Sequence, residues 1–137
     1  MRLSQLDSSS LAQTRCRRVL VVDRDEDQVL TLMELLAMHG FEVAGATDGR
    51  RALATAEVFD PHVVLMDLCL PGIKGCDAAR ALRSSERTKN AVIVAITGYD
   101  GAEEREQSAA AGVDIHLAKP VALSDLLRAV ADSEVHR

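Results

Sequence analysis

Short apolar runs alternate along the chain with segments whose apolar residues recur every three or four positions. The runs are rich in Val, Ile and Leu and are bounded by turn residues, which predicts strands buried on both faces of a parallel sheet. The predicted strands are residues 19–22, 41–46, 63–66, 91–96 and 113–117. The segments that follow them predict amphipathic helices over residues 29–38, 51–59, 75–83, 103–111 and 123–131.

The strict alternation of strands and helices indicates the α/β fold class. Each helix would carry the chain back across a parallel sheet by a right-handed crossover, so that helices cover both faces. With 137 residues and 47% hydrophobic content, the chain is long enough to bury the core of one domain. We expect a flexible polar leader over residues 1–16, a single domain over 17–134 and a short tail over 135–137.

Composition narrows the classes of function. A net charge of -5 argues against direct nucleic-acid binding. Cys16, Cys69 and Cys76 are odd in number and lack metal-ligand spacing, which favours a reducing compartment over a disulfide framework. Neither a membrane-spanning stretch nor the apolar core of a signal peptide is visible, so the expectation is a cytoplasmic protein without membrane insertion.

Reactive side chains end several of the predicted strands. Asp23, Asp67 and Thr97 each follow an apolar run directly, and Lys119-Pro120 follows the last one. Taken singly, such an Asp could be only a helix cap and such a Lys only a solvated side chain. Because the ends of parallel strands lie at the same edge of a sheet, the four groups are expected to converge. Two carboxylates, a hydroxyl and an ammonium could bind a divalent cation and a phosphoryl group.

These residues resemble the receiver domain of two-component response regulators. The matching motifs are Val-Leu-Val-Val-Asp23, Leu-Met-Asp67-Leu-Cys-Leu-Pro-Gly, Ile-Thr97-Gly and Ala-Gly-Val-Asp-Ile-His116-Leu-Ala-Lys119-Pro120. The ordered set, spread over residues 18–130, is much more specific than any one motif. The forms that two of these motifs take here, Thr97-Gly98-Tyr99 and Lys119-Pro120-Val121, look most like those of receiver domains attached to hybrid histidine kinases. The resemblance implies a flavodoxin-like fold with five parallel strands in the order 2-1-3-4-5.

The resemblance also implies a role for each matching residue. Asp67 would accept a phosphoryl group, Mg²⁺ would be held by Asp23, Asp67 and the backbone carbonyl of Cys69, and Lys119 would pair with a phosphoryl oxygen. The Thr97 hydroxyl and the backbone around Gly98 would contact the other phosphoryl oxygens. The peptide bond before Pro120 is expected to be cis.

As a receiver, the chain would be a phosphorylation-dependent switch and would turn over no separate substrate. It would at most catalyse its own phosphorylation and dephosphorylation. The expected partners are a sensor or hybrid histidine kinase or a histidine phosphotransfer protein, and a downstream effector, because few residues follow Val130. A lone receiver, an intermediate phosphoryl carrier and a piece of a hybrid kinase all remain open. A nucleotide- or flavin-binding protein is disfavoured because no glycine-rich phosphate loop follows a strand.

Two residues near these motifs carry alternative interpretations. Asp25 forms a capping box with Gln28 at the start of the first helix, although it could serve as a further metal ligand. Asp100 and Glu103 predict a second capping box, which we interpret as structural only. His116 stands where the family usually has an aromatic switch residue. It is expected to act as that switch or to be an exposed or hydrogen-bonded surface histidine.

Arg24 is the main departure from the family pattern, since many members have a second acid directly after the first. An arginine cannot coordinate a cation, and its charge should weaken Mg²⁺ binding. Asp25 could take over as ligand, Arg24 could turn to solvent and leave a weaker site, or it could pair with Asp67 and partly replace the metal. We favour the second, while a phosphorylation-independent interaction module (a pseudo-receiver) remains the alternative function.

Overall fold

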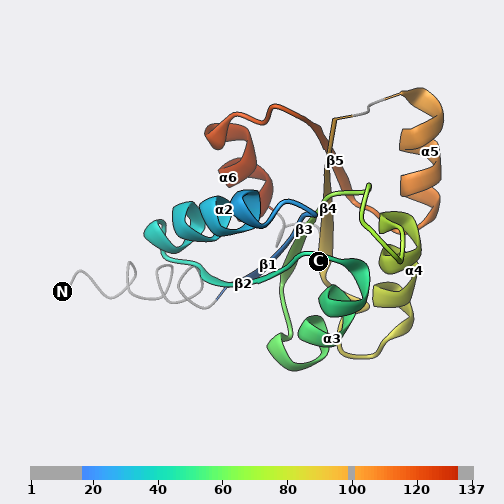
Figure 1. The fold of residues 1–137 in the computed structure, drawn as a ribbon, viewed down its shortest axis with the longest axis horizontal. Helices are drawn as coiled ribbons and strands as arrows, with labels where there is room; N and C mark the ends of the chain where they lie inside the picture. The colour runs from blue at the N-terminus through green and yellow to red at the C-terminus, as the bar shows by residue number, and fades with distance from the viewer. Residues whose placement is uncertain (1–16, 99–100, 133–137) are drawn as a thin grey trace.

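The computed structural model describes residues 17–98 and 101–132, which form a five-stranded parallel sheet with helices on both faces (Figure 1). The strand order is β2-β1-β3-β4-β5, so the predicted flavodoxin-like fold class is confirmed. The strands are β1 (Arg18–Val22), β2 (Glu42–Ala46), β3 (Val63–Met66), β4 (Val92–Thr97) and β5 (Ile115–Ala118). The helices are α2 (Glu26–Met38), α3 (Gly49–Phe59), α4 (Gly75–Ser84), α5 (Ala102–Ala110) and α6 (Leu123–Asp132).

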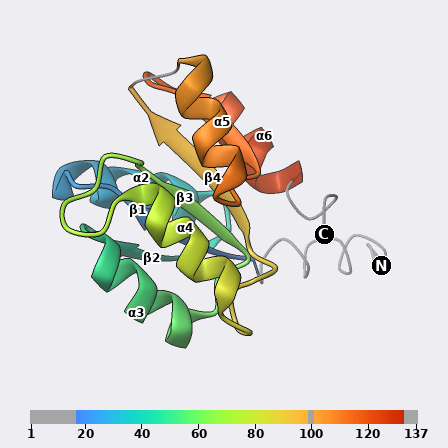
Figure 2. The same ribbon diagram turned by 90° about the vertical axis from the view of Figure 1, so that its right-hand side faces the viewer.

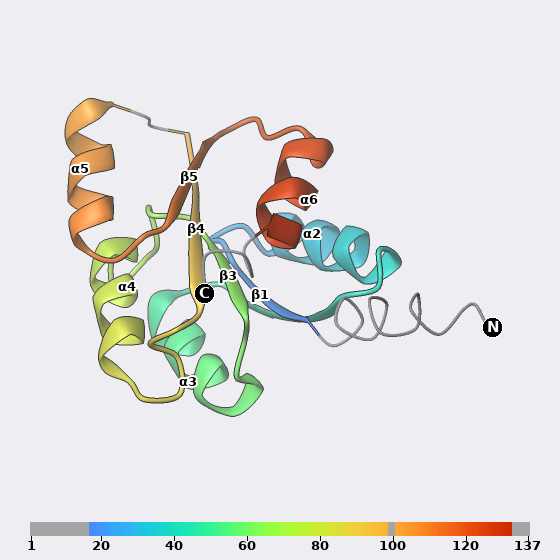
Figure 3. The same ribbon diagram turned by 180° about the vertical axis from the view of Figure 1, so that it is seen from behind.

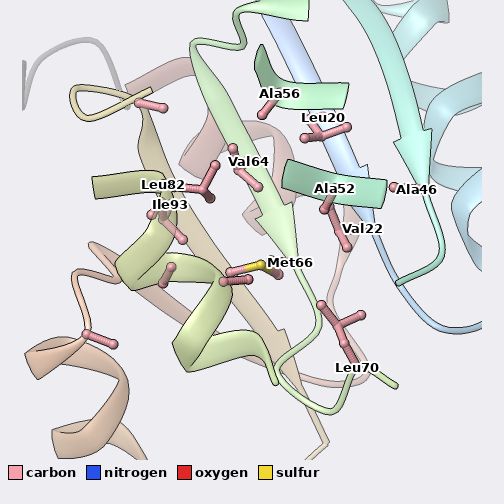
Figure 4. Packing of buried hydrophobic residues seen from close by; sticks show 14 residues of the cluster. Leu20, Val22, Ala46, Ala52, Ala56, Val64, Met66, Leu70, Leu82 and Ile93 are labelled. Atoms are coloured by element: carbon pink, nitrogen blue, oxygen red, sulfur yellow. The ribbon is translucent and has the colours of Figure 1, made fainter. Parts of the chain in front are cut away.

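Alternate residues of the central strands divide the core into two layers, as expected for a sheet buried on both faces. Leu20, Val64 and Ile93 point to the face covered by α3 and α4, where they pack on Ala52, Ala56 and Leu82 (Figure 4). The neighbouring residues Val19, Val63 and Val92 point to the other face and pack under α2 and α6. Figures 2 and 3 show these two layers of helices from the side and from behind.

Several element boundaries differ from the sequence prediction by one to three residues. The last strand begins at Ile115 rather than at residue 113, and the Asp114 carboxylate just before it accepts a hydrogen bond from the Ile93 amide at 2.9 Å. Helix α2 begins at Glu26, three residues earlier than the apolar pattern indicated. Polar first-turn residues do not contribute to the apolar periodicity, so the pattern alone missed them.

Two predicted helix caps have different outcomes. Asp25 is the N-cap of α2, but its carboxylate accepts from the Asp27 amide at 3.0 Å instead of forming the predicted box with Gln28. The N-cap of α5 is Gly101, so the predicted cap is misplaced, and Asp100 itself lies outside the described residues. The predicted leader 1–16 and tail 135–137 also lie outside them. Within the described segments, none of the helices has the length and apolar character that crossing a bilayer demands.

His62 provides a pH-sensitive contact at the amino-terminal edge of the sheet. Its Nδ1 accepts a hydrogen bond from the Arg18 amide at 2.9 Å, which requires that nitrogen to be unprotonated. Burial lowers the pKa of His62 below its ordinary 6.5, and the charges of Arg18 and Arg17 lower it further, whereas Asp60 and Glu42 oppose the shift.

We therefore expect the free energy of unfolding to fall as the pH drops below about 6.5. The unfolded chain binds the proton at its ordinary pKa while the folded state resists it, so the contribution of His62 is fully present above that pH. Urea denaturation between pH 7.5 and 5.5 would measure the slope, which should be smaller in His62→Gln. His39→Gln, a change at an exposed histidine, is the control. Equal slopes for wild type and His62→Gln would contradict the assignment.

Candidate functional site

The strand ends that carry the predicted site residues are adjacent at the carboxyl edge of the sheet. The Asp67 amide donates to the Val22 carbonyl at 2.9 Å, which joins the end of β3 to the end of β1. The Lys119 amide donates to the Thr97 carbonyl at 2.8 Å, which joins the segment after β5 to the end of β4. The parallel register therefore brings together groups that lie far apart in the sequence, as the site prediction required.

Asp23 and Asp67 are the buried acids of this edge, with only 4% and 3% of their surfaces exposed. Each has one oxygen fixed by a backbone amide two residues ahead: Asp23 Oδ1 accepts from Asp25, and Asp67 Oδ1 accepts from Cys69, both at 2.9 Å. These turns orient both carboxylates by local geometry. The second oxygen of each carboxylate, Oδ2, is thus available to a cation.

The ammonium of Lys119 lies between the two carboxylates. Its Nζ donates to Asp23 Oδ2 at 3.2 Å and lies 3.7 Å from Asp67 Oδ2. Asp67 Oδ2 is buried and accepts no hydrogen bond from the described residues. A buried carboxylate oxygen without a hydrogen-bond donor is costly unless it is used for binding or reaction.

The donors present fit a hard divalent cation, although the set is small. Asp23 and Asp67 are the two buried carboxylates of this edge, and residues 17–98 and 101–132 hold no group of three His, Cys, Asp or Glu side chains suited to a metal. Mg²⁺ commonly binds through one or two carboxylates and keeps several waters. A site made of these two carboxylates and one backbone carbonyl is therefore chemically sufficient but weakly charged.

Arg24 directly follows the buried Asp23 and is exposed. It lines a depression of ≈ 610 Å³ together with Asp23, Lys119, Pro120 and Val121. Among the described residues Arg24 forms no ion pair with Asp67, so the alternative in which it pairs with Asp67 and partly replaces the metal is not supported. Its outward position agrees with the interpretation that it turns to solvent.

The remaining predicted residues occupy distinct positions around these groups. Thr97 is the last residue of β4 and is buried, whereas Gly98 is exposed. His116 pairs with Ala95 across β4 and β5, and both its ring nitrogens are buried. His116 is half-buried, so the expectation of an exposed histidine is wrong, while its role as the switch residue stays a prediction. The Lys119-Pro120 bond is cis, as the resemblance implied.

Two glycines that the sequence did not single out hold the loop after Asp67. A Cβ on Gly75 would lie 2.5 Å from the Leu68 Cα, and one on Gly49 would lie 2.7 Å from the Ile73 carbonyl oxygen. Only glycine allows the starts of α4 and α3 to approach the loop so closely. A glycine at the first position of a helix was the available signal.

The cysteines near the site are free thiols. Cys69 is exposed and is held through its backbone amide, so its side chain takes no part in orienting Asp67. Burial raises the pKa of Cys76, which favours the protonated thiol. Cys16 lies outside the described residues.

Comparison with known proteins assigns the family. A sequence model described as "Response regulator receiver domain" matches residues 19–131, which is most of the chain. The chain belongs to this family. The receiver domain is 34% identical over 113 residues to the transcriptional regulatory protein PrrA of Mycobacterium tuberculosis, covering 82% of this chain and 48% of that protein. It thus spans about half the length of that curated relative.

Solved structures agree with the assignment. The chemotaxis protein CheY4 of Vibrio cholerae superposes with a TM-score of 0.82 at 28% identity, over 86% of this receiver domain and 98% of that chain. The receiver domain of the sensor histidine kinase PA1611 from Pseudomonas aeruginosa superposes with a TM-score of 0.77 at 29% identity, over 84% and 94% of the two chains. That structure contains a magnesium ion coordinated in its active site cleft.

Proposed function

We propose that this receiver domain accepts a phosphoryl group on Asp67 from a phosphohistidine of a partner protein. The observation that carries the proposal is Asp67 Oδ2, a buried oxygen 3.7 Å from the Lys119 ammonium that accepts no hydrogen bond from the described residues. In the transfer, a carboxylate oxygen of Asp67 forms the new bond to phosphorus. The phosphorus–nitrogen bond of the donor breaks, and its electron pair returns to the imidazole.

Lys119 and Thr97 would bind the transferred group. The Lys119 ammonium, now shared by two carboxylates, would turn to a phosphoryl oxygen, and the Thr97 hydroxyl and the Gly98 amide would contact the others. Asp23, Asp67 and the Cys69 carbonyl would hold Mg²⁺, which neutralises charge between the carboxylate and the phosphoryl oxygens when it is bound. Asp25 is accounted for as the cap of α2.

Mg²⁺ binding is expected to be weak. The two buried carboxylates are already paired with Lys119, and the fixed positive charge of Arg24 lines the same depression as Asp23 and Lys119. The magnesium ion of the related PA1611 receiver domain supports the identity of the metal.

Phosphorylation would then change the surface formed by α5, β5 and α6. Thr97 would move toward the phosphoryl group, and His116, which is half-buried on β5, would follow as the switch residue. The family supports a histidine kinase or a histidine phosphotransfer protein as donor and an effector as the partner that reads the changed surface. The domain has no separate substrate in this scheme.

A phosphodonor assay would test the proposal. Purified protein is incubated with acetyl phosphate over a range of Mg²⁺ concentrations, and intact mass with peptide mapping locates the label. We expect a label at Asp67 that increases up to millimolar Mg²⁺ and is absent from Asp67→Asn. No label on the wild type at any metal concentration would favour the phosphorylation-independent alternative.

A further inference from the structure

We propose that Arg24 binds the phosphoryl group on Asp67 and supplies its counter-charge when no metal ion is bound. The inference rests on the proposed function, because it needs a phosphoryl group at Asp67. The site would then have two cations that bind the phosphoryl group, Lys119 and Arg24. The same arginine that hinders metal binding would stabilise the phosphorylated state.

The first support is the position and freedom of Arg24. It directly follows the buried Asp23 and lines the same depression as Lys119, the residue that contacts Asp67. The Arg24 side chain has no hydrogen bond or ion pair among the described residues, whereas Lys119 is held by two carboxylates. Arg24 can therefore turn toward a new anion without breaking an existing bond.

The second support is the charge at this edge of the sheet. Before phosphorylation, the single charge of Lys119 faces the buried carboxylates of Asp23 and Asp67. Phosphorylation replaces the charge on Asp67 by about two negative charges on the phosphoryl group. Lys119 alone then leaves roughly two negative charges without a partner beside the buried carboxylate of Asp23, where such an excess is costly. Either a divalent cation or a second basic side chain must approach, and Arg24 is the basic residue that shares the depression with Lys119.

The third support is the chemistry of the guanidinium group. Its planar fork of donors can hold two phosphoryl oxygens at once, and an arginine aimed at a transferred phosphoryl group is an effective way to neutralise it. The same positive charge repels a divalent ion from the site. The structure therefore predicts two ways of neutralising the phosphoryl group, one by metal and one by Arg24, that compete with each other.

Binding of beryllofluoride would test the role of Arg24 without requiring phosphoryl transfer. Beryllofluoride bonds to a carboxylate oxygen and has the shape and charge of a phosphoryl group. It would be titrated into the whole protein in EDTA and in excess Mg²⁺, with binding followed by the amide signals of Cys69 and Gly98 in ¹H–¹⁵N spectra. The variant is Arg24→Gln. The matched control is Arg87→Gln, which removes the same charge from an exposed turn that leads into the opposite end of β4.

In the wild type, removal of the metal should weaken beryllofluoride binding by less than about tenfold. In Arg24→Gln the loss in EDTA should be about a hundredfold or more, while binding in Mg²⁺ should be equal or tighter. Arg87→Gln should behave as the wild type. A purely structural role of Arg24 would change binding in both conditions, and spectra without ligand would show whether the variant is folded.

Other outcomes separate this inference from the proposed function. Wild-type binding only in the presence of Mg²⁺ would overturn the role of Arg24 and leave Asp67 as the phosphoryl acceptor. Equal binding by wild type and Arg24→Gln in EDTA would also overturn it, because Lys119 would then suffice. If neither condition gave binding at Asp67 and the phosphodonor assay gave no label, both proposals would fail.

Discussion

Asp67→Asn is expected to abolish phosphoryl incorporation and at the same time to increase the free energy of unfolding. The side chain is almost fully buried, and its Oδ2 accepts no hydrogen bond from the described residues. Asparagine keeps an oxygen that can accept from the Cys69 amide, as Oδ1 does now at 2.9 Å. Lys119 keeps its shorter contact, 3.2 Å, with Asp23.

The free energy of unfolding of Asp67→Asn should exceed that of the wild type by about 1 kcal/mol, because the substitution removes one of two buried negative charges that share one ammonium. Urea denaturation in EDTA, followed by circular dichroism, would measure it, and intact mass after treatment with a phosphodonor would measure incorporation. Asp77→Asn is the matched control, since this carboxylate is exposed on α4 and forms a surface ion pair with Arg80. A substantially less stable Asp67→Asn protein would show that the wild-type carboxylate is better compensated than these contacts indicate.

Arg83→Met is expected to lower the free energy of unfolding by about 2–5 kcal/mol. The guanidinium of Arg83, at the end of α4, donates to the Gly112 carbonyl at 2.7 and 3.1 Å and to the Ala91 carbonyl at 2.5 Å. It also donates to the Lys89 carbonyl at 3.0 Å and to Asp114 Oδ2 at 2.6 Å. One side chain thus ties α4 to the segments that begin β4 and β5. Methionine would fill much of the volume but would leave these acceptors without their donor.

The same denaturation measurement, with Arg80→Met as control, would test this prediction. Arg80 lies on the same helix, but it is exposed and its ion pair with Asp77 is a surface contact. Its replacement should change stability by less than about 0.5 kcal/mol. Similar losses in the two variants would mean that the Arg83 contacts contribute no more than an ordinary surface arginine.

The Arg83 network shows where sequence patterns stop being informative. Arg83 stands among other polar residues of a helical segment, and nothing in its neighbours distinguishes it from Arg80 or Arg87. Its partners lie up to 31 residues away, in two different loops. Asp114 is a second example. It was predicted to lie within the last strand, but it precedes that strand and its carboxylate accepts hydrogen bonds from the Ile93 amide and from Arg83. Such pairings depend on how helices pack on the sheet, which periodicity does not encode.

The orientation of side chains at the site was also decided by packing. Placing His116 at the position of a switch residue followed from the motif, but the sequence left an exposed ring equally open. The structure buries both ring nitrogens. Likewise, the sequence left Arg24 able to pair with Asp67 or to turn to solvent, and its exposure distinguishes between the two. A side chain's direction follows from the room and the charges around it, and these come from other strands.

By itself, the sequence determined the order of the elements, the parallel sheet and the edge at which Asp23, Asp67, Thr97 and Lys119 meet. It could do so because each apolar run records burial on both faces, and because parallel strands necessarily end at one edge. Only the tertiary structure decided that Lys119 lies between two carboxylates, a contact made across 96 residues, and that one oxygen of Asp67 accepts no hydrogen bond from the described residues. Those features depend on distances between side chains from separate strands, which exist only once the strands are aligned in register.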